Sequence, residues 1–325
     1  MRAVRVAHQP RSRCPRCACR LSTVVMFQAI VRLLLPSLIA VVVAAPGVAA
    51  SEGPAELLSA EPAQSGAARP RVKRDEHGDL VPDVRAAAAI VYDPIRGEVL
   101  WEENSDVQRS IASITKVMTA VVFLESEPDL SEQVTVASSD VRRASTTYLR
   151  RNEQLQVDDL LHLALIASDN GAARALARVS RWGTEGFIDR MNEKAAGLGL
   201  RATVFTDPSG LDAGNVSSAY DLSRLIVYAV GNEQIAQIMR MREHRIATNR
   251  RRVRIRNTNK LLDNDINVWG GKTGFIRRAG YCLAALVQLP QGELVAVVVL
   301  GARSNAARFL ETRRLVGWLN TRLAE

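Results

Sequence analysis

The chain has 325 residues, of which 47% are hydrophobic and 24% are charged. A chain of this length and apolar content can bury a core in one large domain or two small ones, which excludes an intrinsically disordered protein. The formal net charge of +9 is concentrated at the start. Residues 1–50 hold seven of the 43 basic residues and no acidic residue, so residues 51–325 carry 36 basic against 34 acidic residues. A nearly neutral body gives no reason to expect nucleic acid as a partner.

An apolar run from Leu33 to Ala45 follows seven arginines in a segment that has no acidic residue. Small residues come next, at Gly47, Ala49 and Ala50. This layout is typical of a secretory signal, so we expect residues 1–50 to be a signal peptide region, cleaved near Ala49 or Ala50, and the protein to be exported to the periplasm. The run is shorter than a membrane-spanning helix of about 20 residues, although an uncleaved anchor is the alternative. Met26 offers a second start position.

The four cysteines predict neither a disulfide nor a metal site. Cys14, Cys17 and Cys19 precede the signal core, and no companion His or Cys follows in an order that would complete a set of four donors. Only Cys282 remains once the signal is removed. The exported body is therefore expected to depend on its core for stability.

The rest of the chain divides by composition and hydrophobic pattern. Residues 51–85 are rich in Ala, Pro, Ser, Gly and charge without a period, which predicts a flexible lead-in before a domain at residues 86–325. Apolar runs at 86–93 and 97–104 flank a short turn and predict a first β-hairpin. Helical patterns follow at residues 113–125, 157–168, 171–180, 186–199 and 217–231.

Two of these helices carry sequence signals for their ends. The fourth is expected to end in a cap at Gly197. The fifth has Ser218 three residues before Asp221, close to a capping box, and is expected to stop at Gly231.

Strand patterns return towards the C-terminus. Residues 266–275 predict one strand, and residues 280–289 and 293–302 predict a second hairpin. A closing helix is predicted over residues 305–323. Two strands, a helical middle, three strands and a last helix indicate an α/β (α+β) fold with a five-stranded antiparallel sheet, flanked by helices and interrupted by an inserted all-helical lobe.

A hydroxyl and an amine stand in the most apolar of these helices. Ser113 and Lys116 are three residues apart, so on a helix their side chains share one face. A serine is a weak nucleophile unless a base takes its proton, and a lysine can be that base only when burial or positive charge lowers its pKa. The apolar surroundings supply the burial. By itself, however, such a pair also arises by chance.

Two tripeptides further along the chain strengthen the interpretation. S-D-N at residues 168–170 falls at a break between two helices, where Ser168 and Asn170 project from a short loop. K-T-G at residues 272–274 lies in a predicted strand whose glycines leave the backbone open to close approach. Each tripeptide alone is an ordinary helix cap or glycine-rich strand. In the order S-x-x-K, S-D-N, K-T-G they form the motif set of penicillin-binding proteins and class A β-lactamases.

With these motifs the chain resembles a low-molecular-mass penicillin-binding protein of the serine-type D-alanyl-D-alanine carboxypeptidase/endopeptidase family, peptidase family S11. The resemblance runs from about Ala87 to the C-terminus and includes "RNTNKLL" and "GGKTGFIRRAGYCL". It implies a β-lactamase/transpeptidase-like fold and an acyl-enzyme mechanism without a metal or an organic cofactor. It also implies peptidoglycan stem peptides as substrates and β-lactam antibiotics as acylating inhibitors.

The resemblance implies a role for each motif residue. Ser113 would be the acylated nucleophile and Lys116 its general base. Ser168 would relay a proton towards the leaving amine. This is acyl transfer followed by hydrolysis of the ester.

The remaining motif residues would hold the substrate. Asn170 would orient Lys116 or bind the substrate amide. Lys272 and Thr273 would hold the substrate's terminal carboxylate or its backbone. The backbone N–H groups of Ser113 and Phe275 would form the oxyanion hole.

The family has subtypes, and this chain resembles the shorter one. Many carboxypeptidases of this kind continue into a C-terminal β-rich domain and an amphipathic anchor helix, whereas this sequence stops at Glu325, directly after its closing helix. The short endopeptidase type cuts D-Ala to diaminopimelate crosslinks. Because both subtypes share all three motifs, the preference between them stays open.

Two other functions compete with this interpretation. A class A β-lactamase would add an E-x-x-L-N stretch between Asn170 and Lys272, and no glutamate there fits that pattern: Glu185, Glu193, Glu233 and Glu243. A protein that binds penicillin or muropeptides without turnover is the other alternative.

The remaining chemistry-bearing residues favour no further site. His77, His162 and His244 lack the spacing of a metal pair and are expected to be structural or solvated. The basic run from Arg240 to Lys260 has no interleaved aromatic residue, and its "RVRIR" predicts a strand with one solvated face. We expect no nucleic acid, whereas peripheral association with the membrane or contact with an anionic cell-wall polymer stays open.

Overall fold

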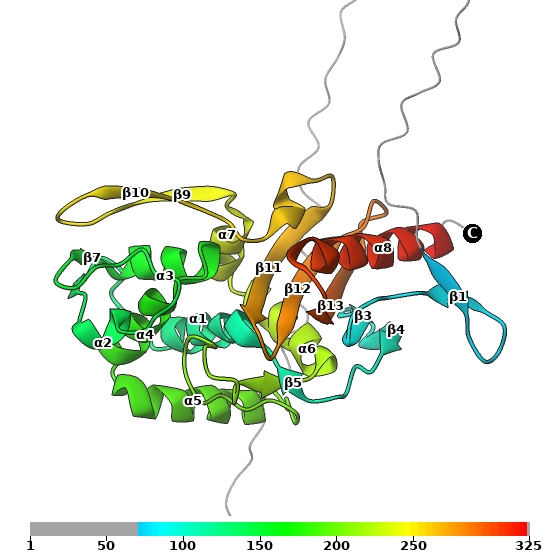
Figure 1. Cartoon of the computed structure of the whole chain (residues 1–325), viewed down its shortest axis with the longest axis horizontal. Helices are drawn as coiled ribbons and strands as arrows, with labels where there is room; N and C mark the ends of the chain where they lie inside the picture. Colours follow the sequence, from blue (N-terminus) through cyan, green and yellow to red (C-terminus); the bar gives the residue numbers. More distant parts are fainter. Residues whose placement is uncertain (1–70, 324–325) are drawn as a thin grey trace, which may run out of the picture. The chain divides into compact units, whose positions relative to one another are not determined.

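A computed structural model describes residues 71–323 of the chain. Its main element is a five-stranded antiparallel sheet with the strand order β11-β12-β13-β3-β4 (Figure 1). The strands are β3 (Ala88–Asp93), β4 (Glu98–Glu103), β11 (Asn267–Ile276), β12 (Gly280–Gln288) and β13 (Leu294–Ala302). Two strands come from the beginning of the described chain and three from its end, so the predicted sheet and both predicted hairpins are confirmed.

Both faces of this sheet are apolar because helices cover both. Successive residues of a strand point to opposite faces. On β13 they alternate between two hydrophobic clusters, with Ala296, Val298 and Leu300 in one and Val295, Val297 and Val299 in the other. The second cluster includes residues of α8 (Asn305–Leu323), and the first includes residues of α6 (Ala219–Val230). The predicted closing helix is therefore confirmed as the cover of one face.

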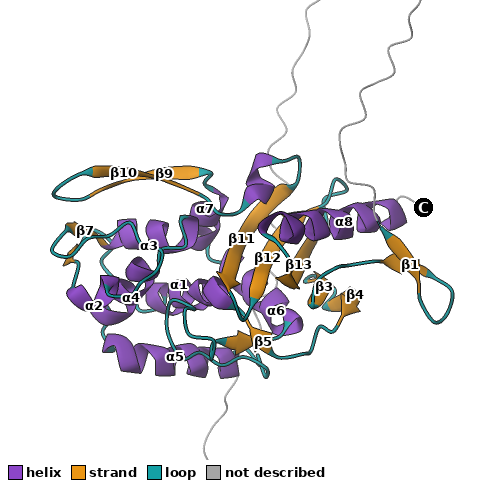
Figure 2. Cartoon of the chain, in the orientation of Figure 1, coloured by secondary structure: helices purple, strands orange, loops and turns teal. Residues whose placement is uncertain are grey.

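A helical lobe lies between β4 and β11 in the sequence, as predicted (Figure 2). Besides α6 it comprises the 3-10 helix η2 (Ala112–Thr115), α1 (Lys116–Leu124), α2 (Ser138–Val141), α3 (Val157–Ile166), α4 (Asn170–Val179), α5 (Gly183–Gly197), α7 (Glu233–Arg240) and the 3-10 helix η3 (Lys260–Asp263). Two short antiparallel pairs join it, β5 (Arg109–Ser110) with β8 (Val216–Ser217) and β6 (Gln133–Thr135) with β7 (Gln154–Gln156).

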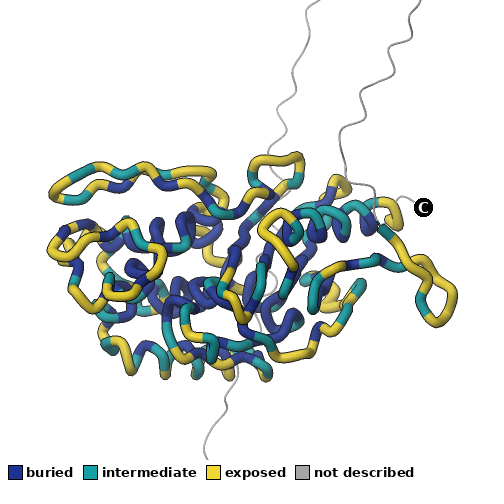
Figure 3. Tube along the Cα trace, viewed as in Figure 1, coloured by how far each residue is buried: buried dark blue, intermediate teal, exposed yellow. Residues whose placement is uncertain are grey.

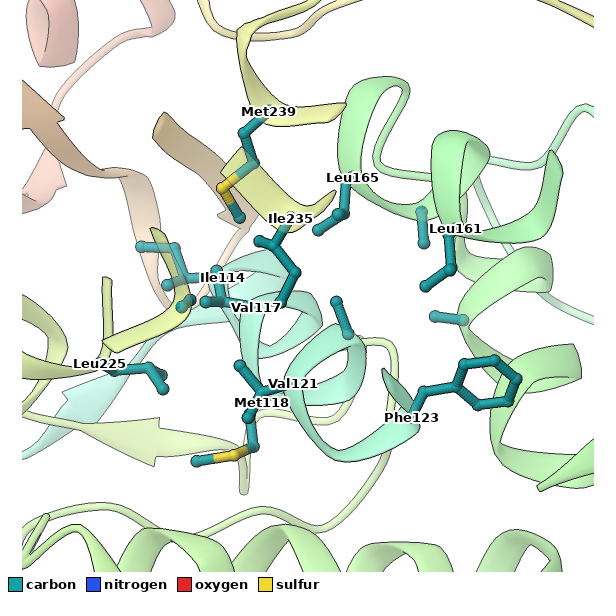
Figure 4. Close-up of a cluster of buried hydrophobic side chains, with 14 of the residues drawn as sticks. Ile114, Val117, Met118, Val121, Phe123, Leu161, Leu165, Leu225, Ile235 and Met239 are labelled. Carbon is teal, nitrogen blue, oxygen red and sulfur yellow. The ribbon is translucent and has the colours of Figure 1, made fainter. Parts of the chain in front are cut away.

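Helix α1 is the buried centre of this lobe. Every residue from Lys116 to Phe123 is buried (Figure 3). Figure 4 shows side chains of three other helices around α1: Leu161 and Leu165 of α3, Leu225 of α6, and Ile235 and Met239 of α7. A helix that is apolar on all sides has to be enclosed in this way. The enclosure fixes η2, the turn directly before α1, against its neighbours.

Two predicted helix ends have different outcomes. Ser218 is the N-cap of α6, because its hydroxyl oxygen accepts a hydrogen bond from Asp221 N at 3.0 Å, and α6 ends just before Gly231 as expected. The predicted cap at Gly197 is wrong. Helix α5 includes Gly197, and Gly199 adopts the left-handed conformation (φ +67°) that ends the helix.

Two further hairpins lie outside the main sheet. The first joins β9 (Glu243–Ala247) to β10 (Arg252–Arg256), and its residues alternate between covered and exposed, which confirms a strand with one solvated face. The second joins β1 (Val72–Arg74) to β2 (Leu80–Pro82), so the expectation of a flexible lead-in is wrong for residues 72–82. A turn closed by Asp75, which accepts bonds from Gly78 N and Asp79 N, was hidden by the polar composition.

Several predictions concern residues outside the described part of the chain. These are the signal peptide region, the alternative start at Met26, the cluster of Cys14, Cys17 and Cys19, and the lead-in over residues 51–70. Within residues 71–323, no helix is both long enough and apolar enough to cross a membrane.

Candidate active site

The S-x-x-K motif begins the site at the start of α1. Ser113 lies in η2, a 3-10 turn in which residues three apart are nearly eclipsed. As a result Lys116 Nζ donates a hydrogen bond to Ser113 Oγ at 2.9 Å. Ala112, directly before the serine, has a left-handed backbone (φ 49°), which a non-glycine residue rarely adopts. Ser113 itself is only partly buried, so a reacting group can approach its hydroxyl.

Burial changes the chemistry of Lys116. Its side chain is fully buried, and this loss of solvation lowers the pKa of Lys116 to about 7, although the carboxylates of Asp207 and Asp169 act in the opposite direction. The amine also donates to Asn170 Oδ1 at 2.6 Å and to the carbonyl of Ser209 at 2.5 Å. About half of an amine with this pKa is neutral at pH 7, and a neutral amine can accept a proton from a serine hydroxyl.

The S-D-N motif forms the second wall of the site, between α3 and α4. Asp169 caps α4, since its Oδ1 accepts from Ala172 N at 2.9 Å. This cap places Asn170 in the first turn, where its Nδ2 donates to the carbonyl of Ala144 at 2.8 Å and its Oδ1 faces Lys116. Ser168 adopts a left-handed backbone (φ 59°) in the loop. Both predicted residues of this motif therefore lie at the site.

The K-T-G motif forms the third wall, on the edge strand β11. Lys272 Nζ donates to Ser168 Oγ at 2.8 Å, so the strand and the S-D-N loop meet through these two side chains. Burial, together with the positive charges of Lys116 and Arg308, holds the pKa of Lys272 well below its usual range. Thr273 is buried beside it. An anion that reaches these residues would restore the charge of Lys272 by pairing with it.

Close approach of β11 to the serine depends on Gly274. A Cβ at this position would lie 2.6 Å from the carbonyl oxygen of Ile111 and 3.1 Å from Ser113 N. Only a glycine lets the strand backbone pass beside the serine in this way. The next residue, Phe275, leaves its ring half exposed and stacked on Tyr281, with 4.2 Å between the ring centroids. The backbone of the two predicted oxyanion residues, Ser113 and Phe275, thus belongs to neighbouring segments.

Sequence reasoning missed a loop, residues 206–215, that contacts Lys116. Asp207 accepts hydrogen bonds from the backbone N–H groups of Ser209 and Asp212 at 2.5 and 2.7 Å, and from Asn215 Nδ2 at 2.6 Å. Burial alone would raise the pKa of Asp207, but these bonds outweigh it and hold the pKa below its usual value. The loop presents the Ser209 carbonyl to Lys116. Its density of Asp, Gly, Ser, Pro and Asn in "TDPSGLDAGN" was the available signal.

Two further residues that the motifs did not indicate contact the K-T-G strand. Thr258 Oγ1 lies 2.6 Å from Thr273 Oγ1, within hydrogen-bond distance. Arg308 of α8 is buried and donates from Nη1 to the carbonyl of Gly274 at 3.0 Å and to that of Cys282 at 3.3 Å. Burial lowers the pKa of Arg308 to about 10. Arg308 therefore ties β11 to β12 on the side of the sheet away from the helical lobe.

His162 and His244 lie apart from the three motifs. His162 and His244 stack on each other with 4.0 Å between their ring centroids, joining α3 to β9. Among residues 71–323, no group of three or more His, Cys, Asp or Glu side chains is arranged to hold a metal ion. Cys282 is buried, and burial raises the pKa of its thiol to about 11. The reactive constellation is thus Ser113 and Lys116 with Ser168, Asn170 and Lys272 around them.

Comparisons with known proteins agree with this arrangement. Residues 75–304 match the family model for D-alanyl-D-alanine carboxypeptidase, peptidase family S11. A D-alanyl-D-alanine endopeptidase of Pseudomonas aeruginosa is 36% identical over 247 residues, covering 74% of this chain and 79% of the relative. A D-alanyl-D-alanine carboxypeptidase of Escherichia coli is 35% identical over 254 residues, covering 73% of this chain and 62% of the relative.

A solved structure extends the likeness to the fold. Penicillin-binding protein D2 from Listeria monocytogenes, in a cefotaxime-bound form, superposes with a TM-score of 0.65 and 31% sequence identity. The match covers 72% of this chain and 98% of that protein. The predicted penicillin-binding protein fold is therefore confirmed, and the chain belongs to the D-alanyl-D-alanine carboxypeptidase family, peptidase family S11.

Proposed function

We propose that this chain is a serine-type DD-peptidase that hydrolyses D-Ala bonds in peptidoglycan stem peptides through an acyl-enzyme on Ser113. The observation that carries the proposal is the contact between Lys116 Nζ and Ser113 Oγ, 2.9 Å apart, with the pKa of the buried Lys116 lowered to about 7. A buried amine of that pKa can activate a serine near neutral pH without a histidine. Membership of the S11 family supports the same reaction.

The acylation step follows from the positions of the groups. Neutral Lys116 takes the hydroxyl proton while Ser113 Oγ attacks the D-Ala carbonyl carbon, and the carbonyl oxygen becomes an oxyanion. The N–H groups of Ser113 and Phe275 stabilise that oxyanion. The C–N bond then breaks, and Ser168 passes to the leaving amine the proton that Lys116 took. The acyl group stays on Ser113 as an ester, and Lys116 is neutral again. Ser168 suits this relay because its hydroxyl oxygen is hydrogen-bonded by Lys272.

Hydrolysis completes the cycle with the same groups. Water adds to the ester carbonyl while Lys116 takes a proton from it, and the ester C–O bond breaks. The proton returns to Ser113 Oγ, so the free serine and a carboxylic acid product result. Lys272 and Thr273 bind the terminal carboxylate or the backbone of the substrate. Asn170 keeps Lys116 directed at Ser113 through its 2.6 Å hydrogen bond.

We assign the crosslink as the preferred substrate, so that the enzyme is a DD-endopeptidase that cuts D-Ala to diaminopimelate bonds. The support is the relative from Pseudomonas aeruginosa, which is named a D-alanyl-D-alanine endopeptidase and of which 79% is covered. Carboxypeptidase activity on terminal D-Ala is the second activity, because a carboxypeptidase of similar identity is also a relative. β-Lactams acylate Ser113, as the cefotaxime-bound form of the Listeria protein suggests by analogy.

The proposed substrate also places the enzyme outside the cytoplasm. Peptidoglycan lies beyond the cytoplasmic membrane, and the Arg-bearing apolar run of residues 1–50 has the layout of a secretory signal. We therefore propose export to the periplasm, with cleavage near Ala49 or Ala50, a peptidase domain over residues 86–325, and a peripheral association with the cell wall.

One experiment separates the functions. Purified protein is incubated with crosslinked muropeptides, and the products are weighed by mass spectrometry. Loss of the crosslinked dimer supports the endopeptidase, and loss of terminal D-Ala alone reduces the proposal to a carboxypeptidase. Rapid steady-state hydrolysis of penicillin would mean a β-lactamase. Labelling by penicillin with no peptide product would mean a binding protein without turnover.

A further inference from the structure

The β9–β10 hairpin carries a concentration of positive charge that the catalytic steps do not use. Residues 242–256 hold seven arginines and a single acidic residue, Glu243. The rest of residues 51–325 holds 29 basic and 33 acidic side chains, so the positive charge is local to this hairpin. Figure 1 shows the hairpin extending from the end of α7 over α3.

The arginines gather on one face of the hairpin. Its exposed side carries Arg245, Arg252, Arg254 and Arg256, here called the arginine face, together with Glu243 and Ala247. Arg245 lies directly opposite Arg254 across the two strands. Like charges in that position destabilise a strand pair. Glu243 offsets part of this repulsion by bonding Arg254 Nε at 2.9 Å.

The opposite face of the hairpin is fixed to the helical lobe. Ile246 and Ile255 are buried there, and His244 stacks on His162 of α3. The arginine face is therefore supported along its length by α3.

The tip of the hairpin is fixed as well. Asn249 and Gln154 exchange two hydrogen bonds, Asn249 N to Gln154 O at 2.9 Å and Gln154 N to Asn249 Oδ1 at 3.0 Å. Arg251 pairs with the fully buried carboxylate of Glu153 at 2.7 Å. The backbone of the hairpin is therefore held against the lobe at its tip, so the positions that carry the arginine face keep their place along it.

The base of the hairpin leads directly to the site. Thr258, two residues after β10, lies 2.6 Å from the hydroxyl of Thr273 in the K-T-G motif. Beside it lies a pocket of about 230 Å³ whose charged lining residues are Arg242, Arg256 and Lys260 together with the acidic Glu243 and Asp263. A polymer held at Thr273 would thus continue over the base of the arginine face.

We propose that the arginine face binds the carboxylate-bearing peptidoglycan polymer and holds it beside the catalytic serine. Guanidinium groups pair with carboxylates through two parallel hydrogen bonds, and the stem peptides of this polymer repeat free carboxylates along each strand. The inference rests on the proposed function, since the polymer is the proposed substrate. It assigns to the hairpin the binding of polymer that lies outside the catalytic residues.

The test uses the full chain with three arginines changed together, Arg245→Gln, Arg252→Gln and Arg254→Gln. A control variant makes the same change in net charge at three exposed arginines elsewhere, Arg201→Gln, Arg303→Gln and Arg322→Gln. Sedimentation with purified peptidoglycan sacculi at low salt measures binding. We expect the hairpin variant to bind about fivefold to tenfold more weakly and the control to bind like the wild type, with the difference shrinking as salt screens the charges.

Activity separates this inference from the proposed function. The hairpin variant should cleave a small soluble muropeptide dimer and react with penicillin at the wild-type rate, but release less product from intact sacculi. Equal binding of both variants to sacculi would overturn the inference even if the wild type cleaves the dimer. Loss of binding to anionic phospholipid vesicles with unchanged binding to sacculi would also overturn it, in favour of a lipid surface. A wild type that cleaves no dimer would defeat the proposed function and leave the sacculus-binding comparison intact.

Discussion

The pH dependence of acylation is the sharpest consequence of the buried lysine. Lys116 serves as a base only when it is neutral, and burial lowers its pKa to about 7. With that pKa, about 9% of the amine is neutral at pH 6 and about 91% at pH 8. Lowering the pH from 8 to 6 should therefore slow acylation of Ser113 about tenfold, with a midpoint near pH 7.

Stopped-flow measurement of acylation by a fluorescent penicillin, from pH 5.5 to pH 9, tests this directly. The carboxylate of penicillin stays ionised over that range, so the slope reports the enzyme. Circular dichroism at each pH checks that the fold is unchanged. A rate that is flat between pH 6 and pH 8, or that rises only near the ordinary lysine pKa of about 10.4, would refute Lys116 as the neutral base.

Three further predictions concern residues around the serine. Asp207→Asn removes a charge that raises the pKa of Lys116, so the midpoint of the acylation profile should move to lower pH. In Asp207→Glu, which keeps the charge, the midpoint should stay. An unmoved midpoint in the Asn variant would contradict the charge effect. Thr258→Ala should lower kcat/KM for muropeptides about fivefold to tenfold, because the hydrogen bond to Thr273 is lost. Thr258→Ser keeps the hydroxyl and should stay near the wild type. Equal losses of kcat/KM in both variants would contradict a role for this hydrogen bond. Gly274→Ala should slow penicillin acylation by about 10²-fold or more, because its Cβ meets the Ile111 carbonyl, and wild-type acylation would contradict the close approach.

Most of the fold was predictable because its strands and helices have local hydrophobic patterns in the sequence. Strands β3 and β13 are apolar on both faces and bounded by turns, so their positions follow from the sequence, as does the closing helix at 305–323. The 3-10 geometry of η2 was not predictable, because Ser113 and Lys116 would share a face in an α-helix as well. The hairpin at 72–82 was missed because three-residue strands leave almost no periodic signal.

The motif residues of the site were predictable, and the groups that support them were not. Ser113, Lys116, Ser168 and Lys272 stand in motifs whose residue types declare their chemistry, and the structure brings them within hydrogen-bond distance of one another in pairs. The carbonyl of Ser209 carries no residue-type signal, because any residue could supply it.

Arg308 escaped prediction for a related reason. In the sequence it is one of several charged residues in the predicted C-terminal helix. Only the packing of α8 against one face of the sheet brings its guanidinium to the Gly274 carbonyl. Long-range contacts of this kind depend on the assembled fold and leave no local pattern.

The identity of the nucleophile can be measured most directly by locating the acyl group. Wild-type protein and Ser113→Ala are incubated with penicillin, and intact and proteolysed samples are weighed by mass spectrometry. We expect one penicillin mass on the wild type, carried by the peptide that contains Ser113, and none on the variant. A covalent adduct on Ser113→Ala, or a wild-type adduct on a peptide without Ser113, would contradict the assignment of Ser113 as the catalytic serine.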